Sequence, residues 1–250
     1  MFTQHACATP RPSSHPAARL RSHTAILIGL ALASGHAGAS EPSGNATATT
    51  DYVWRGTTQS QGDPALQAGL KLAGARGVYA SAWASSVAFP TDPKASTELD
   101  LVVGWSGALS PQWSLDVNLT HYRYPAATSD LDWTELVGTL TWKQDRWLQL
   151  GHSRHALAGD RPGTYAQLGA RWPWGERLRV EAVAGRYWFD GVDGDGRTHA
   201  GYAHAQLGAV WAIAAPLELR VTVHTTDNAA KRLFPGLAGT RIEGALQASF

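Results

Sequence analysis

The feature of this chain that most constrains its fold is the strict alternation of long and short connections between its strand-like segments. Twelve amphipathic segments of strand period follow the first 39 residues, and the chain ends on Phe250. The long connections are Gly56–Pro64, Ala88–Thr97, Tyr124–Asp132, Ser153–Gly163, Phe189–Ala200 and Thr226–Gly239. The short ones are Ala73–Gly77, Ala108–Gln112, Lys143–Arg146, Pro173–Arg177 and Ala212–Pro216. Outer-membrane barrels have short periplasmic turns and longer extracellular loops. The alternation therefore predicts an all-β fold, an antiparallel transmembrane β-barrel of about 12 strands.

The N-terminal residues have the organisation of an export signal. Arg19 and Arg21 precede an apolar stretch of 11 residues, Thr24–Ser34, and the small residues Ala37–Ala39 form a cleavage site. The apolar stretch is too short to cross a bilayer as a helix, which takes about 20 residues. We therefore expect residues 1–39 to be a signal peptide and residues 40–250 to be a single outer-membrane β-barrel domain.

The strand-like segments alternate in polarity with a period of two. Leu99, Leu101 and Val103, for example, alternate with Glu98 and Asp100, which is the pattern of a strand with one apolar face. The same period occurs in Pro64–Leu72, Trp113–Leu119 and Leu217–Thr226, and less regularly in Thr49–Arg55, Val78–Val87 and Trp133–Trp142. Unpaired backbone amides cost several kcal/mol in hydrocarbon, so we expect the strands to close into a ring, with Thr49–Arg55 as the first strand.

Aromatic residues support a membrane location. The last segment alternates up to Phe250, and such a terminal strand resembles the assembly signal of outer-membrane proteins, which implies the barrel-assembly machinery as a partner. Tryptophans gather at the ends of the predicted strands, where interfacial girdles form: Trp54, Trp105, Trp113, Trp133, Trp142, Trp147, Trp172 and Trp188. We expect a location in the bacterial outer membrane, with the apolar faces against lipid.

Charged residues on the polar faces are the candidate pore-lining residues. They are Asp51, Arg55, Lys71, Glu98, Asp100, Asp116, Glu135, Arg179, Glu181, Glu218, Arg220, Arg241 and Glu243. On the fourth to sixth predicted strands, the inward charged residues are acidic and none is basic. Arginines concentrate on the eighth to twelfth strands. Opposed walls of this kind would set charge preference in a pore. The alternative is a lumen closed by paired charges.

A segment near the start of the barrel resembles a known family. Residues Asp51–Gly69 read DYVWRGTTQSQGDPALQAG, followed by Gly77–Val87, Glu98–Gly107, Tyr122–Pro125 and Trp133–Leu140. These segments are similar to the TorF family of porin-like proteins, also named the Gcw_chp family of proteobacterial proteins. The resemblance covers roughly the first half of the exported chain. It implies an outer-membrane barrel with channel activity and supplies no catalytic residues. Trp54 stands where the family often has Phe.

Other chemistries have weak support. Removal of Arg11, Arg19 and Arg21 leaves 18 basic against 20 acidic residues, a net charge of −2, which argues against a nucleic-acid partner. Gly151–His155 lacks the second glycine and the helix of a nucleophile elbow around Ser153. Asp190–Gly196 is similar to part of a calcium loop but lacks its closing Glu. We expect no enzyme, no cofactor and no metal site.

These observations predict a porin-like channel for passive diffusion of small hydrophilic solutes, with outer-membrane lipid as its surroundings. Two alternatives remain open, because similar barrels serve several functions. One is a non-conducting structural or surface-interaction barrel with a filled lumen. The other is an outer-membrane hydrolase, which would need Ser153 or another nucleophile beside a histidine.

Overall fold

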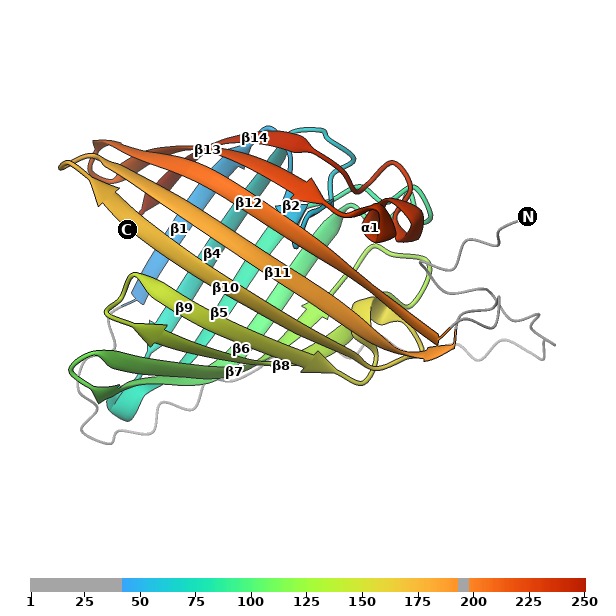
Figure 1. The fold of residues 1–250 in the computed structure, drawn as a ribbon, viewed down its shortest axis with the longest axis horizontal. Coiled ribbons are helices and arrows are strands. Elements are labelled where there is room, and N and C mark those ends of the chain that lie inside the picture. The colour runs from blue at the N-terminus through green and yellow to red at the C-terminus, as the bar shows by residue number, and fades with distance from the viewer. Residues whose placement is uncertain (1–41, 193–197) are drawn as a thin grey trace, which may run out of the picture.

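A computed structural model describes residues 42–192 and 198–250, so the expected signal peptide lies outside the described residues. Twelve strands form one closed antiparallel barrel (Figure 1). They are β1 (Pro42–Thr49), β4 (Ala65–Ala73), β5 (Val78–Ser86), β6 (Thr97–Ser110), β7 (Trp113–Arg123), β8 (Trp133–Trp142), β9 (Arg146–Ser153), β10 (Gly163–Trp174), β11 (Leu178–Val192), β12 (Thr198–Ala214), β13 (Leu217–Thr226) and β14 (Arg241–Ser249). Each strand pairs with its neighbours in the chain, and β1 pairs with β14 to close the ring. The predicted fold and strand number are confirmed.

The connections alternate as predicted. Only Pro111 and Gln112 separate β6 from β7, whereas the connection from β13 to β14 is long and carries the helix α1 (Asn228–Leu233). In Figure 1 the C-terminus lies at the left end of the barrel and α1 lies at the right end. Among the described residues, no helix has the length and apolar character needed to cross a bilayer.

One long connection is shorter than expected. The predicted link Phe189–Ala200 is mostly strand, since β11 extends to Val192 and β12 begins at Thr198. The pairing continues because Tyr187 and Tyr202 face each other across the two strands and are both fully buried inside the barrel. The calcium-like segment of this link falls on residues whose side chains lie outside the described part of the chain.

The two faces of the strands have the predicted phase. Leu66 on β4 is 72% exposed, and Leu101 on β6 and Val221 on β13 are exposed as well. Their alternating neighbours Glu98 and Thr222 are buried. An apolar outer surface and a polar interior are the arrangement of a transmembrane barrel, in which lipid covers the outer surface.

The first strand was predicted in the wrong place. β1 is Pro42–Thr49 and not Thr49–Arg55, and it pairs along its whole length with β4 and from Asn45 to Thr49 with β14. Its sequence, PSGNATAT, contains mainly small residues, so it has little alternation in hydrophobicity. Backbone hydrogen bonds to both neighbours determine its place, because a closed ring leaves no edge strand.

The terminal residue Phe250 completes the pairing at the seam. Its N–H donates to the Gly44 carbonyl at 2.9 Å, and the Gly44 N–H donates to the Phe250 carbonyl at 2.6 Å. A Cβ on Gly44 would lie 2.7 Å from Cε2 of the Phe250 ring, so the ring packs directly on the glycine. The aromatic terminus therefore contacts the first strand of the barrel.

Two of the tryptophans expected at the membrane interfaces lie inside the barrel instead. Trp172 and Trp188 are exposed on the outer surface, as an interfacial girdle requires. Trp133 is buried, however, and stacks on Tyr122 with ring centroids 4.2 Å apart, while Trp54 contacts both of these rings. The prediction was wrong for Trp54 and Trp133, because position at a strand end does not specify which face a side chain occupies.

Asp92 joins two of the long loops. One carboxylate oxygen accepts from the N–H and hydroxyl groups of Thr128 at 2.7 and 2.9 Å, and from those of Ser129 at 2.8 and 2.8 Å. The Ser129 N–H, together with the other donors, holds the pKa of Asp92 well below its ordinary value against the opposing effect of burial. The loop that follows β5 is thereby fixed to the loop that follows β7.

Candidate functional site

Residues 50–64, which follow β1, leave the sheet and form what we call the inward hairpin. It contains the two short strands β2 (Val53–Trp54) and β3 (Thr57–Thr58). The turn residues Arg55 and Gly56 have φ of 46° and 84°, as tight hairpins with two positive φ values require. Asp51 and Arg55 were expected on a barrel strand, but they belong to this hairpin.

Contacts with widely separated strands place the hairpin inside the barrel. Tyr52 packs against Trp83 of β5 with ring centroids 5.4 Å apart. A Cβ on Gly56 would lie 2.7 Å from Cβ of His204 on β12 and from Cγ2 of Thr226 on β13. The turn therefore approaches the opposite wall more closely than a residue with a side chain could, and the hairpin crosses the lumen.

Arg55 forms a buried ion pair with Glu135 of β8. Its two terminal guanidinium nitrogens donate to the two carboxylate oxygens at 2.8 Å each, and the side chains are 8% and 0% exposed. Burial lowers the pKa of Arg55, but Glu135, together with Tyr122 and Tyr187, raises it above its ordinary value. Arg55 also lies over Tyr165, with its guanidinium carbon 3.8 Å from the ring centroid.

Gly151 leaves space in the barrel wall for the Glu135 carboxylate. A Cβ on Gly151 of β9 would lie 2.5 Å from Oε1 of Glu135, so a larger residue at this position would displace the acceptor. The Tyr122 hydroxyl donates to Oε2 of Glu135 at 3.3 Å. Both carboxylate oxygens are therefore bonded, as a charge buried away from water requires.

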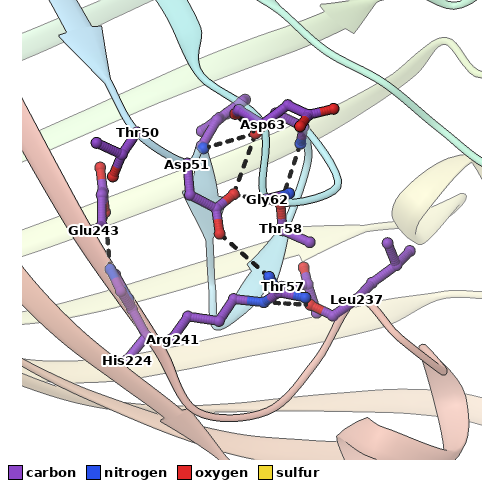
Figure 2. Close-up of polar contacts among 12 residues, drawn as sticks. Thr50, Asp51, Thr57, Thr58, Gly62, Asp63, His224, Leu237, Arg241 and Glu243 are labelled. Carbon is purple, nitrogen blue, oxygen red and sulfur yellow. Dashed lines mark hydrogen bonds and ion pairs between the residues drawn. The ribbon is translucent and has the colours of Figure 1, made fainter.

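The base of the inward hairpin is tied to the last long loop, as Figure 2 shows. Asp51 accepts from the Thr58 hydroxyl and from the Ser60 hydroxyl within the hairpin, the latter at 3.1 Å. Its other oxygen accepts from Nη1 of Arg241 on β14 at 3.3 Å. The Thr58 N–H donates to the Leu237 carbonyl at 3.0 Å. The hairpin is thus held at its base by Asp51 and at its turn by Arg55.

A cavity of about 350 Å³ lies in the lumen against the hairpin. Its lining combines amide, hydroxyl and aromatic side chains with a single charged residue, Arg55. The lining residues are Val53, Trp54, Arg55, Asn118, Thr120, Tyr122, Val137, Gln149, Tyr165, Gln167, His204 and Gln206. Small-molecule sites begin at about 300 Å³, so the lumen holds space for one small solute beside the hairpin.

A second charged cluster lies beside the short turns of the barrel. Arg179 of β11 makes a two-point contact with Glu218 of β13 at 2.6 and 2.8 Å, and its Nε donates to Glu181 at 2.9 Å. Arg220 donates to the other oxygen of Glu181 at 2.6 Å. These four candidate pore-lining residues therefore form one network, in which each carboxylate has an arginine partner.

Among the acidic residues of β6 to β8, Glu135 pairs with a base, whereas Glu98 and Asp116 contact tyrosine hydroxyls. The inward hairpin supplies Arg55 as a base to Glu135, whereas Arg123 at the end of β7 is exposed. The Glu98 carboxylate accepts from the Tyr124 hydroxyl at 2.8 Å, and Asp116 accepts from the Tyr79 hydroxyl at 2.9 Å. The sequence predicted no inward base on these strands, and the base that pairs with Glu135 comes from the inward hairpin.

Of the remaining candidate residues, Lys71 and Glu243 have local partners, whereas Asp100 has a buried oxygen without one. The Lys71 ammonium lies 3.7 Å from the centroid of the Tyr79 ring. Glu243 accepts from the Thr49 hydroxyl at 3.0 Å and contacts Nε2 of His224 at 2.8 Å. On β6, one oxygen of Asp100 is buried without a hydrogen bond in the part of the chain that the structure describes.

The features considered for catalysis or metal binding are not brought together. The Ser153 hydroxyl accepts from the backbone N–H of His155 at 3.2 Å, and the ring of His152 contacts the Thr164 hydroxyl at 3.0 Å. Within residues 42–192 and 198–250, no group of three His, Cys, Asp or Glu side chains could hold a metal ion.

Sequence reasoning did not single out the amide side chains of the lumen. Asn118, Gln149, Gln167 and Gln206 come from β7, β9, β10 and β12, yet all line the same cavity. Each of these amides lies on the polar face of its strand, so the period of two could have identified them. The prediction included only the charged residues of that face.

One family model covers most of the chain. A family model described as a bacterial protein of unknown function (Gcw_chp) matches residues 33–248. No curated protein matches the chain.

Solved structures with a similar fold are outer-membrane porins and channels. The NanC porin has a TM-score of 0.51 and 10% identity, over 84% of this chain and 99% of that chain. The KdgM porin has a TM-score of 0.49 and 9% identity, over 83% and 99% of the two chains. An outer membrane channel from Pseudomonas putida F1 has a TM-score of 0.49 and 10% identity, over 85% and 95%. At this identity, the similarity to the NanC porin establishes the barrel fold alone.

Proposed function

Because this chain belongs to the Gcw_chp family of bacterial proteins, whose function is unknown, we propose a function from its lumen. The protein is a porin-like channel of the bacterial outer membrane, through which small hydrophilic solutes diffuse passively. The observation that carries this proposal is the polar cavity of about 350 Å³ inside a closed twelve-stranded barrel. A barrel of this size lies between the filled eight-stranded and the wide sixteen-stranded barrels.

The membrane location is part of the same proposal. The exposed apolar side chains of the outer surface, such as Leu66 and Val221, favour contact with outer-membrane lipid. We propose that residues 1–39 direct export, that residues 40–250 form the barrel domain, and that the barrel-assembly machinery recognises the strand ending at Phe250. The segment that resembles the TorF porins includes residues 51–64 of the inward hairpin, which supports a TorF-like channel.

We assign the inward hairpin the role of a constriction. It crosses the lumen and is held by the ion pair between Arg55 and Glu135 and by the contact between Asp51 and Arg241. Solutes would pass around it or through a passage that opens when it moves. The charged network around Arg179 and Glu218 lies next to the short turns that precede β11 and β13 and would contact solutes at that end of the lumen. The proposal includes no cofactor and no covalent step.

A second candidate function is a non-conducting structural or surface-interaction barrel. The burial of Arg55 and Glu135 favours it, because a firmly held hairpin fills the lumen. The two candidates differ in conductance. Purified protein reconstituted into planar bilayers should give discrete current steps, and liposomes that contain it should swell in small neutral and charged solutes. Absence of current over a wide voltage range, both in the native protein and in a variant without Arg55, would reject the channel in favour of the second candidate.

A further inference from the structure

The cavity beside the inward hairpin has the chemistry of a binding site for one class of solute. We infer that it is a subsite for a neutral, hydroxyl-rich molecule of the size of one sugar ring. This inference deepens the proposed channel function and rests on it, because a solute reaches the cavity only through an accessible lumen. It differs from the charge-selective pore that the charged residues suggested.

Amide and hydroxyl groups converge on the cavity from four strands. Asn118 and Thr120 lie on β7, and Gln149, Gln167 and Gln206 lie on β9, β10 and β12. An amide offers both hydrogen-bond donors and an acceptor, and a hydroxyl group does the same. A lining of this kind can therefore match several hydroxyl groups of one ligand at the same time.

Part of this hydrogen-bonding capacity is unused. Gln167 accepts from the Tyr165 hydroxyl at 2.7 Å, which leaves its NH₂ group without a partner among the described residues. Gln149 donates to the Thr139 hydroxyl at 3.2 Å and keeps its carbonyl oxygen available. In the part of the chain that the structure describes, the Gln206 side chain makes no hydrogen bond, although it lines the cavity. Unpaired donors and an unpaired acceptor are thus both available to a ligand.

The charge of the cavity favours a neutral ligand over an ion. Arg55 is its only charged lining residue, and both terminal nitrogens of the guanidinium group already donate to Glu135. An anion would have to compete with Glu135 for the guanidinium group of Arg55. A cation would find the Glu135 carboxylate already paired with Arg55. A site that desolvates an ionic ligand without a free counter-charge binds it poorly.

The size limits the ligand to a small molecule. The volume of about 350 Å³ lies near the lower end of small-molecule sites. The inward hairpin closes one side through Val53, Trp54 and Arg55. The cavity therefore takes a single ring and not an extended chain. A ligand in it would touch the hairpin that constricts the lumen.

The inference can be tested with D-glucose, D-glucuronate and D-glucosamine, which share a ring and differ in charge. Binding to the detergent-solubilised full barrel is measured by calorimetry, and block of ion current by each sugar is measured in planar bilayers. Glucose should bind and reduce the current more strongly than either charged sugar. Gln206→Ala and Gln149→Ala should each weaken glucose binding about tenfold, because each removes a hydrogen-bonding group from the site.

Gln247→Ala is the matched control, since Gln247 lies on β14 and outside the cavity. Heat-modifiable migration in gels establishes that each variant still forms a barrel. Equal binding of all three sugars, or equal loss in the Gln206 and Gln247 variants, would overturn the subsite. Glucose binding without any current would reject the channel but support the subsite. Current without preferential glucose binding would support the channel but reject the subsite.

Discussion

Replacing Arg55 by alanine should release the inward hairpin from the barrel wall. Glu135 would keep only the Tyr122 hydroxyl as a partner, after losing two hydrogen bonds of 2.8 Å to the guanidinium group. Breaking a buried ion pair by removing one partner costs about 3–5 kcal/mol, because the other charge stays buried and unpaired. A tenfold change in an equilibrium corresponds to about 1.4 kcal/mol. The ratio of docked to undocked hairpin should therefore fall by about 10²- to 4 × 10³-fold.

Single-channel recording in planar bilayers measures this change. The Arg55→Ala protein should show larger current steps or a higher open fraction than the native protein. Glu135→Ala should act in the same direction, since it leaves the arginine unpaired. The double variant should be affected less than the sum of the single changes, because it leaves no unpaired charge, and the difference measures the coupling of the pair.

Arg179→Ala is the matched control. It also removes an arginine with a two-point contact to a carboxylate, Glu218, but Arg179 is not part of the inward hairpin or of the cavity lining. It should change charge preference without raising the open fraction. Native-like current in Arg55→Ala, in a variant that still forms a heat-modifiable barrel, would refute the role of the ion pair in holding the hairpin. So would equal effects of the Arg55 and Arg179 changes.

Three further predictions concern the loops, the acidic side chains and the terminus. The hydrogen bonds of Asp92 to the loop should persist as the pH falls past the ordinary pKa of aspartate. They should be lost only at lower pH, because the pKa of Asp92 in the folded protein is below its ordinary value. Asp92→Asn should speed hydrogen exchange in residues 124–132 at neutral pH, and unchanged exchange would contradict this role. Replacing Asp100 and Asp116 together by Asn should shift ion selectivity toward anions; unchanged reversal potentials would exclude a contribution from these acids. Deletion of Phe250 should reduce assembly into the outer membrane while export continues, and fractionation with normal assembly would count against the terminal signal.

Local sequence patterns were sufficient to predict the barrel. The face of each strand follows from a period of two, so Leu101 and Val103 could be placed outside and Glu98 inside from neighbouring residues alone. The alternation of short and long connections distinguished the two ends of the barrel. The alternating polarity of the last segment placed Phe250 at the end of the last strand.

The first strand and the interior tryptophans needed the whole structure. Pro42–Thr49 has little alternation and becomes a strand because β4 and β14 both pair with it. Trp133 resembles an interfacial residue in the sequence, but it lies inside because it packs against Tyr122 and the hairpin residue Trp54. Such contacts join residues that are distant in the chain.

The sequence by itself determined the closed barrel, its apolar outer surface and its polar interior, because each depends on regular alternation between neighbours. Only the tertiary structure decided what the interior contains. The ion pair between Arg55 and Glu135 joins residues 80 positions apart, and the amides of the cavity come from separate strands. No local pattern specifies such partners, since they meet only when the ring closes and the hairpin folds into it.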